Sequence, residues 1–458
     1  MLLLTAFQIQ LMSSFKAFPN LSTFRKILPS LLSGQVTFGQ EGLLSVVDRT
    51  SDFPSLQIPL PGFEEPAFLP EFTQPAETIV TTLPNGLRIG TQNSEESCVS
   101  VGLLVDSGCI YEDSRTCGVS HLLEKMAFHS TKNRSIALLM QEAQAVAVNF
   151  TSSSACDQMF YTGHGIKTFF PQIVEILLDS VRNAAFEELE VKEQLLRIEE
   201  ESRYLESDPE ALLIRRLHST GYSGDYAKSY FASKSSMTGL DSLTLHEFVD
   251  ENYTASRMVL SAVGVEHQKF LAIAEPLLLD LPKMPSSPMP KFKYVGGDWR
   301  EPKELPDTHI ALAFEVPNGW QNERLANTLT VLKYLLGSGE SFSVGGPGKG
   351  MYTRFYKNVL KHPEVQAIQT FSSIYNYTGL FGVLVCTNSD FASQTVDITC
   401  DELLSITSRG KVTNQEFERA KNATISAVLM SLECRTAVIE DIACQIMSYG
   451  RRYAMSVT

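Results

Sequence analysis

Residues 118–128 read Gly-Val-Ser-His-Leu-Leu-Glu-Lys-Met-Ala-Phe. On a helix, side chains three and four positions apart share one face, so His121, Glu124 and Lys125 are predicted to project together. A zinc site of the inverted zincin type requires His-x-x-Glu-His at this spacing, with two imidazoles on the metal and a glutamate as general base. Here a lysine stands in the place of the second histidine, and a protonated ammonium has no lone pair to give to zinc. The stretch therefore predicts a protease-type helix that has lost one metal ligand.

A third ligand of such a site would be a glutamate further along the chain. The acidic stretch Glu187–Glu206 offers several candidates, and Glu201 follows Lys125 by 76 positions. A run of charges of this kind is more often the solvated face of a helix. From the residues alone, both interpretations of the stretch stay open.

A second motif is rich in glycine. Residues 337–351 read Gly-Ser-Gly-Glu-Ser-Phe-Ser-Val-Gly-Gly-Pro-Gly-Lys-Gly-Met. A P-loop is excluded because glycine, not serine or threonine, follows Lys349, and a dinucleotide fingerprint is excluded because Phe342 stands where glycine is needed. A flexible surface linker is the default interpretation of Gly/Ser-rich segments. Phe342, Pro347 and Met351 are unusual in such a linker and favour a binding loop.

Together, these two motifs resemble the alpha subunits of mitochondrial processing peptidases, a branch of the insulinase/pitrilysin superfamily. The similarity extends from about residue 75 to the end of the sequence and includes the stretches 83–88, 105–108 and 432–435. The resemblance implies an α+β fold of two homologous domains, each a mostly antiparallel sheet with helices packed on it.

The resemblance also implies a division of labour between two subunits. The family's beta subunit carries the zinc and the catalysis, whereas the alpha subunit binds no cofactor, is not an enzyme on its own, and holds the presequence of an imported precursor in its glycine-rich loop. The expected location is the mitochondrial matrix, where association with the inner membrane is compatible with the family. The substrate-binding residues implied in this way are Gly337, Gly339, Ser341, Phe342, Gly345, Gly346, Gly348, Lys349, Gly350 and Met351. The degenerate metal site comprises His121, Glu124, Lys125 and Glu201.

Some residues depart from the family pattern. Active members place an acid seven residues before the distal glutamate, and Gln194 stands there in this chain. Glu340 interrupts the glycine-rich loop, and Ala145-Val146 replaces a common Gly-Gly pair. Two other functions stay open, namely a structural core protein of the respiratory bc1 complex and an active peptidase. The Gly-Pro-Gly-Lys-Gly-Met part of the loop argues against the first, because it would be expected to be eroded in a core protein, and Lys125 argues against the second.

Composition narrows the classes of partner. The chain has 458 residues, 43% of them hydrophobic, and a formal charge of −14. Nucleic-acid binders carry basic faces, so a nucleic-acid partner is not expected. A basic partner such as a presequence suits the negative charge, although soluble proteins in general avoid zero net charge. No apolar stretch reaches the length of a membrane span, and eight scattered cysteines fit free, structural thiols.

The chain is predicted to divide into five segments. Residues 1–40 contain three basic residues and no acid, which is typical of a mitochondrial targeting segment. Residues 41–76 form an extended lead-in, 77–281 the first domain, 282–306 a proline-rich linker and 307–458 the second domain, which carries the glycine-rich loop.

The pattern of apolar residues predicts similar elements in both halves. In the first half we expect a hairpin over 78–89 with its turn at 84–86, strands at 98–105, 159–162 and 258–265, and a helix over 170–183. In the second half we expect strands at 309–316, 365–375 and 379–387, with helices over 327–336 and 392–408. The second half lacks a counterpart of the strand 258–265, so we expect this domain to be truncated at its C-terminal side, with an unpaired sheet edge.

Overall fold

The computed structural model describes residues 77–458 except 229–236, 238, 284–289, 341–350 and 454–458. The predicted targeting segment 1–40 and lead-in 41–76 lie outside the described residues, as does the central part of the glycine-rich loop. None of the described helices is long and apolar enough to cross a bilayer.

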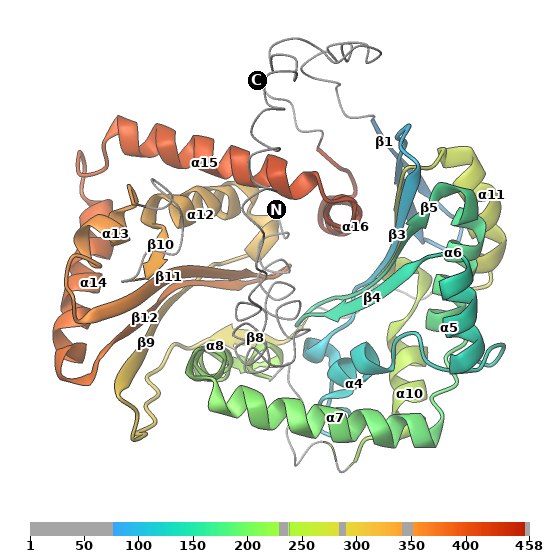
Figure 1. The fold of residues 1–458 in the computed structure, drawn as a ribbon, viewed down its shortest axis with the longest axis horizontal. Helices are drawn as coiled ribbons and strands as arrows, with labels where there is room; N and C mark the ends of the chain where they lie inside the picture. Colours follow the sequence, from blue (N-terminus) through green and yellow to red (C-terminus); the bar gives the residue numbers. More distant parts are fainter. Residues whose placement is uncertain (1–76, 229–236, 238, 284–289, 341–350, 454–458) are drawn as a thin grey trace, which may run out of the picture. The chain divides into compact units, whose positions relative to one another are not determined.

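The first half is a six-stranded sheet with helices packed on it (Figure 1). Its strands are β1 (Thr78–Thr82), β2 (Arg88–Gln92), β3 (Cys98–Val105), β4 (Asn149–Ser154), β5 (Met159–Ile166) and β7 (Met258–Val263). Its α-helices are α4 (Val119–Met126), α5 (Ile136–Ala145), α6 (Phe170–Arg182), α7 (Glu188–Ser207), α8 (Pro209–Gly221), α10 (Ser242–Asn252) and α11 (His267–Leu278). Short 3₁₀ turns cover Cys109–Tyr111 (η2), Lys167–Phe169 (η3), Asp225–Ala227 (η4) and Ala255–Arg257 (η5).

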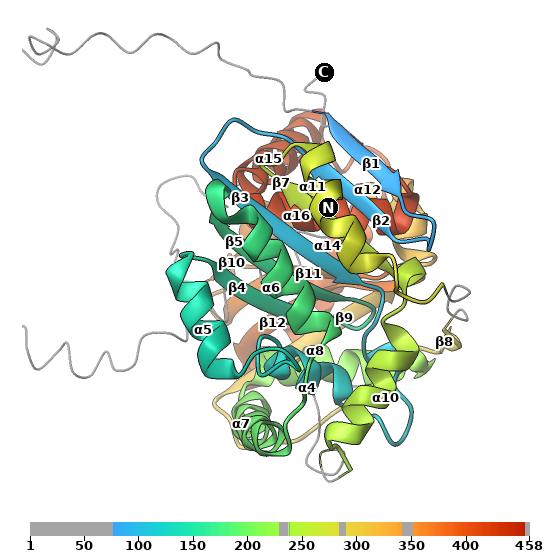
Figure 2. The same ribbon diagram turned by 90° about the vertical axis from the view of Figure 1, so that its right-hand side faces the viewer.

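The strand order of this sheet is β1-β2-β7-β3-β5-β4, with β2 and β7 parallel and the other neighbours antiparallel. The β1–β2 hairpin turns at Asn85 and Gly86, where Gly86 has φ +95, a conformation that suits glycine. Strand β3 is central and pairs with β7 on one side and β5 on the other. Figure 2 views the sheet from the side on which α6 and α11 lie.

The second half repeats this plan in a smaller sheet. Its strands are β9 (Asp307–Glu315), β10 (Ser338–Glu340), β11 (Val365–Ile374) and β12 (Gly379–Asn388), in the antiparallel order β10-β11-β12-β9. Its helices are α12 (Glu323–Leu336), α13 (Arg354–Asn358), α14 (Ala392–Thr407), α15 (Asn414–Leu432) and α16 (Arg435–Tyr449), with 3₁₀ turns at Gly319–Gln321 (η6) and Ser389–Phe391 (η7). A separate two-stranded ribbon, β6 (Tyr222–Gly224) with β8 (Phe292–Tyr294), follows α8 and precedes the rest of the linker.

Helix α16 comes from the second half and packs on the sheet of the first. Ile439, Ile442 and Ile446 are buried against β3, β5 and β7, on the face opposite α6 (Figure 1). Two strand glycines make room for the helix. A Cβ atom on Gly90 would lie 2.3 Å from Ile446 Cδ1, and one on Gly102 would lie 3.0 Å from Ile439 Cδ1. These glycines are needed for the close approach of the helix to the sheet.

Helix α8 makes the reciprocal contact, from the first half to the sheet of the second. Its partly buried leucine and isoleucine side chains pack with residues of β9, β11 and β12 in a cluster shared by both halves. His218 on α8 hydrogen-bonds the Tyr375 hydroxyl at 2.8 Å, and Asp157 accepts a hydrogen bond from the Asn376 backbone N–H at 2.9 Å. The two halves are therefore joined by apolar contacts and buried polar contacts, with one helix of each half packed on the sheet of the other.

Asp157 provides a test of this junction. Burial raises the pKa of this carboxyl to about 7, and the nearby Asp106 carboxylate adds to the effect, while the hydrogen bond from Asn376 opposes it. Because the folded pKa lies above the unfolded value, folding takes up a proton, and stability falls as pH rises from about 4 to about 7. Asp157→Asn keeps an acceptor for Asn376 and removes the ionisation.

We expect the melting temperature of the Asp157→Asn variant to exceed that of the wild type by several degrees at pH 8 and by much less at pH 5. Thermal unfolding followed by circular dichroism at both values checks this. Burial raises the pKa of Glu440 to about 7 as well, but this contribution is present in both proteins and cancels in the comparison. A difference between variant and wild type that is independent of pH would contradict the assignment.

The predicted elements are confirmed with small shifts in their ends. The hairpin, the strands β3, β5, β7, β9, β11 and β12, and the helices α6, α12 and α14 lie where the apolar pattern places them. All eight cysteines are free thiols, as expected. Within the described residues, β9 is the edge strand of its sheet, and no strand takes the place that β7 has in the first half.

Candidate functional site

The predicted motif lies on helix α4, whose start is fixed by a buried carboxylate. Glu112 is 2% exposed and accepts hydrogen bonds from the backbone N–H groups of Gly118 at 2.7 Å and Ser120 at 2.8 Å. A negative charge at this end is favoured because the first N–H groups of a helix have no partner within the helix. Burial nevertheless raises the pKa of Glu112, against the effect of these hydrogen bonds. Sequence reasoning missed this residue because a glutamate six positions before the glycine that precedes a helix carries no recognisable pattern.

Glu124 is held by strand β4. The Ser154 hydroxyl donates to its carboxylate Oε2 at 2.8 Å, the Ser154 N–H lies 3.2 Å from the same atom, and the Ser152 hydroxyl donates to the Glu124 carbonyl at 2.9 Å. The carboxylate is therefore fixed by its own half of the molecule.

Lys125 forms an ion pair with the distal glutamate. Its Nζ lies 2.8 Å from Glu201 Oε2 and 3.9 Å from Glu124 Oε1, while His121 Nε2 lies 3.7 Å from Glu201 Oε2. The nearby His121 imidazole and the pairing with Lys125 lower the pKa of Glu201 to about 2, although burial acts in the opposite direction. The structure thus brings together all four residues of the predicted degenerate site. The choice of Glu201 within the acidic stretch, left open by the sequence, agrees with this geometry.

These residues do not fit a zinc ion. A metal would need lone pairs from the residue at position 125, and the structure instead places an ammonium against the carboxylate that would be the third ligand. Among the described residues, no group of three or more His, Cys, Asp or Glu side chains is arranged to hold a metal. The ammonium supplies a positive charge to Glu201, as a metal would, but it cannot polarise water or a carbonyl as a Lewis acid.

Gln194, which stands where active relatives are expected to have an acid, also has a local role. Its side chain is 3% exposed and its Nε2 lies 3.1 Å from His129 Nε2. His129 in turn has Nδ1 3.2 Å from the Ala127 carbonyl, just after α4. The amide thus joins α7 to the end of α4 through His129.

A Lys125→His replacement is expected to bring back part of the metal site. The variant would present two imidazoles on one face of α4 opposite Glu201, which is the ligand set of an inverted zincin. We expect about one zinc per chain after exchange into metal-free buffer with a weak chelator, measured by elemental analysis, and none in wild type. Lys125→Gln is the matched control, because it removes the charge without adding a ligand. If the Lys125→His variant binds no zinc either, the other residues around the site, including Gln194, do not support metal binding.

The glycine-rich loop begins at β10, which is the edge strand of the second sheet on the side opposite β9. Helix α12 ends at Gly337, which has φ +80 and donates its N–H to the Lys333 carbonyl at 2.8 Å. The Gly337 carbonyl accepts a hydrogen bond from the Thr370 hydroxyl at 2.9 Å, and β10 then pairs with β11. Of the ten predicted substrate-binding residues, only Gly337, Gly339 and Met351 lie within the described residues.

The far end of the loop is anchored by a buried arginine. Arg354 begins α13 and its guanidinium lies 2.5 Å from Glu402 and 3.4 Å from Glu416. It also donates to the Ser405 hydroxyl at 2.9 Å and to the Lys411 carbonyl at 3.1 Å. Arg354 and Glu402 are each 8% exposed on their side chains, so this charged pair is buried, and a guanidinium–carboxylate pair is specific in geometry. Both ends of the loop are therefore attached to well-packed parts of the second half.

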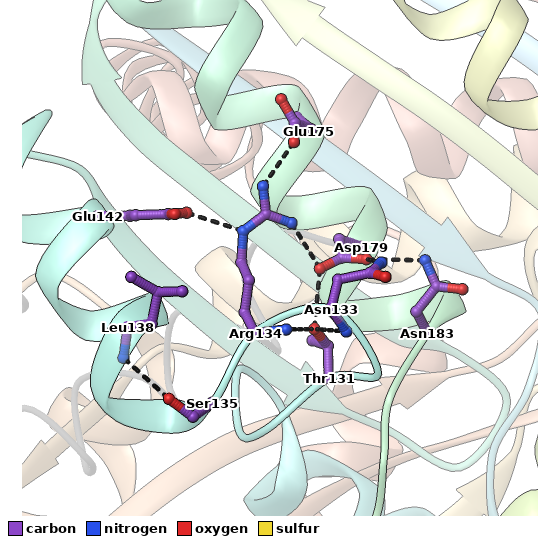
Figure 3. Close-up of polar contacts among 9 residues, drawn as sticks. All are labelled: Thr131, Asn133, Arg134, Ser135, Leu138, Glu142, Glu175, Asp179 and Asn183. Carbon is purple, nitrogen blue, oxygen red and sulfur yellow. Dashed lines mark hydrogen bonds and ion pairs between the residues drawn. The ribbon is translucent and has the colours of Figure 1, made fainter.

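A separate cavity of about 410 Å³ lies beside α5 and α6 and is lined by charged groups (Figure 3). Arg134 projects between three carboxylates, with 2.8 Å to Glu142, 2.5 Å to Glu175 and 2.7 Å to Asp179. Burial raises the pKa of Asp179, but hydrogen bonds from Asn183, Asn133, Arg134 and Thr131 outweigh it, so the net shift is downward. Because these groups satisfy one another, we interpret the cavity as part of the packing between the 131–134 loop and α6.

The fold and the site define the class of this protein. It has the two-domain architecture of a peptidase of the inverted zincin type, with the protease helix in place and a lysine–glutamate ion pair where the metal would be.

Comparison with known proteins agrees with this class. The family model described as "Insulinase (Peptidase family M16)" matches residues 88–233, and the model "Peptidase M16 inactive domain" matches residues 240–424. A potato (Solanum tuberosum) protein named "Mitochondrial-processing peptidase subunit alpha" is 48% identical over 90% of this chain and 82% of its own length. An Arabidopsis thaliana "Probable mitochondrial-processing peptidase subunit alpha-2, chloroplastic/mitochondrial" is 47% identical over 88% and 81% of the two chains. The human "Mitochondrial-processing peptidase subunit alpha" is 31% identical over 87% and 79%. The chain belongs to the insulinase family of peptidases, family M16, and within it to the mitochondrial-processing peptidase alpha subunits.

Proposed function

We propose that this chain is the non-catalytic, substrate-recognising subunit of a mitochondrial processing peptidase. In this role it pairs with a zinc-bearing beta subunit in the mitochondrial matrix and binds the presequences of imported precursors through residues 337–351. The observation that carries the proposal is the Lys125–Glu201 ion pair, which removes the metal chemistry from a site that still has His121 and Glu124 on one face of α4. Since the chain cannot activate water with a metal there, its contribution to cleavage is binding and positioning.

The proposed binding loop has the support that such a role requires. Its first residue is held by α12 and Thr370, and its last residues lead directly into the buried Arg354 network. A loop with fixed ends loses less conformational freedom when it binds a peptide than a loop with free ends does. The formal net charge of the chain, −14, adds long-range attraction for a basic peptide.

The test is binding of a fluorescent presequence peptide, measured by anisotropy, to the complex of this chain with a zinc-free beta subunit. We expect binding that weakens as salt rises, because charge attraction is screened, and that is lost when residues 341–350 are replaced by a Gly-Ser linker of the same length. A peptide with glutamates in place of its arginines is the control and should not bind. Binding that survives replacement of the loop would contradict the proposed role of the loop. A stable complex that binds no peptide would favour the alternative of a structural core protein.

A further inference from the structure

Two cysteines that are far apart in the sequence lie against each other near the junction of the two halves. Cys109 begins the 3₁₀ turn η2, and Cys156 lies between β4 and β5, 47 positions further along the chain. The Ile110 N–H donates to the Cys156 carbonyl at 3.1 Å. The two thiols are themselves in hydrogen-bonding contact. Cys109 and Cys156 are therefore neighbours in both backbone and side chain.

Gly108 allows the two segments to come this close. A Cβ atom on Gly108 would lie 2.4 Å from the Cys156 carbonyl oxygen and 2.6 Å from the Ala155 carbonyl oxygen, which is closer than atoms can approach. A disulfide joins Cα atoms about 4.4–6.8 Å apart and sulfurs about 2.05 Å apart. Since the backbones and the thiols are already in contact, a bond between Cys109 and Cys156 needs rotation of two side chains rather than movement of the chain.

The hydrogen bonds that the two thiols make to other groups are long. Cys109 Sγ lies 3.9 Å from the Lys228 carbonyl, and Cys156 Sγ lies 3.5 Å from the Tyr375 hydroxyl. A thiol is a weak donor, so the loss of these two contacts costs little. The Tyr375 hydroxyl keeps its 2.8 Å hydrogen bond with His218 when Cys156 no longer donates to it.

The two cysteines differ in their exposure to solvent, which sets the order in which they react. Cys109 is fully buried, whereas Cys156 is half-buried. The contact with Cys156 and burial raise the pKa of the Cys109 thiol well above its usual value, although the Lys228 ammonium acts in the opposite direction. A small oxidant therefore reaches Cys156 first, and Cys109 is placed to react with the oxidised sulfur.

We propose that Cys109 and Cys156 form a redox modification site, which hydrogen peroxide converts into a disulfide and a dithiol reductant restores. The Cys156 sulfur attacks one peroxide oxygen, the O–O bond breaks, and the departing hydroxide takes the thiol proton and leaves as water. The Cys109 sulfur then attacks the sulfenic acid on Cys156. The S–O bond breaks, and its oxygen leaves as water with the Cys109 proton. The two thiols lose two electrons, and the peroxide gains them as it becomes two waters.

The disulfide would form beside the contacts that join the two halves. Cys156 precedes Asp157, which accepts a hydrogen bond from the Asn376 N–H, and it contacts Tyr375, which is hydrogen-bonded to His218 on α8. The bond would fix η2 to the turn between β4 and β5 at this place. It would also close a loop of 47 residues in the unfolded chain. Because the loop restricts the unfolded state, we expect the oxidised chain to melt about 5 °C higher than the reduced chain.

The test is peptide mapping of the full chain by mass spectrometry after treatment with hydrogen peroxide. Free thiols are alkylated in denaturant before digestion, and no reductant is added. We expect a cross-linked pair of peptides that contains Cys109 and Cys156. After dithiothreitol, we expect the cross-linked pair to disappear and both cysteines to be alkylated. The melting temperature is measured by circular dichroism before and after each treatment.

The matched variants are Cys109→Ser and Cys386→Ser. Without Cys109, we expect Cys156 to stop at the sulfenic acid, which dimedone traps, and the rise in melting temperature to be lost. Cys386 is half-buried like Cys156, but its sulfur lies 4.0 Å from His309 Nε2 and 3.8 Å from Gln366 Oε1. The Cys386→Ser variant should therefore form the bond and show the full rise.

The results that would overturn the inference are distinct. Treated wild type in which Cys109 and Cys156 stay separate, either as thiols or with Cys156 oxidised on to a sulfinic acid, would overturn the modification site. A cross-link from either cysteine to a different one would do the same. A bond between the two that does not raise the melting temperature would overturn its effect on stability. If Cys109→Ser fails to fold, the cross-linked peptides of the wild type and their loss on reduction decide.

Discussion

Replacing Gly337 by alanine is expected to reduce this chain's stimulation of presequence cleavage on the order of 10²-fold. Gly337 has φ +80, which an alanine adopts only with strain. In addition, a Cβ atom at this position would lie 2.3 Å from the Thr353 side chain, which is closer than atoms can approach. To relieve this contact, the end of α12 or the segment before α13 must move. Each of them carries one end of the loop, so the loop is displaced in either case. A displacement of about 1 Å in a group that positions substrate is enough for a loss of this size.

Gly450→Ala is the matched control for this prediction. Gly450 also has a positive φ, +70, but a Cβ atom on it would have no other atom within 4 Å, and it follows α16, outside the Arg354 network that anchors the loop. It carries a positive φ without the collision with Thr353. Cleavage by the zinc-bearing partner is measured at saturating complex, together with the melting temperature of each variant. Equal losses in the two variants would mean that general destabilisation, not loop position, explains the effect.

Replacing Ile442 by alanine is expected to destabilise the protein by about 3 kcal/mol, within the range known for buried isoleucine. Ile442 is fully buried in α16, where it packs among residues of β3, β5 and β7. The cavity left by the missing methyl groups lies between a helix of one half and the sheet of the other. Neither Gly90 nor Gly102 has a side chain that could fill it. The same change therefore loosens the connection between the two halves.

Denaturant unfolding measures the loss of stability, and limited proteolysis reports on the junction, where the variant should be cut earlier than wild type. Ile425→Ala on α15 is the control, since Ile425 is 43% exposed and such a change usually alters stability by about 0.5 kcal/mol or less. An Ile442→Ala variant as stable as the control would mean that α16 does not depend on its contact with the first sheet.

The parts of the site that follow local spacing were predictable from the sequence. His121, Glu124 and Lys125 lie on one face because three and four residues make about one helical turn, and the structure confirms this. The failure of position 125 as a metal ligand follows from the chemistry of lysine alone. The selection of Glu201 among many acids required the three-dimensional arrangement, because charge runs look alike along a helix.

Long-range packing was beyond the sequence pattern. Nothing in the α16 segment indicates that it packs on strands formed by residues far earlier in the chain, since a helix with many apolar residues fits several sheets equally well. The glycines that receive it, Gly90 and Gly102, look in the sequence like weak points of two strands, and their purpose is visible only with α16 in place. Glu112 gave no signal for the same reason, because its partners are backbone N–H groups.

The central claim is that this chain contributes binding and the partner contributes chemistry. The most direct measurement is cleavage of a fluorogenic presequence peptide by this chain alone, by a zinc-bearing beta subunit alone, and by the two together. The account predicts no cleavage by this chain alone, with or without added zinc, and strong stimulation of the beta subunit that is lost when residues 341–350 are replaced. Zinc-dependent cleavage by this chain alone, abolished by His121→Ala, would contradict it.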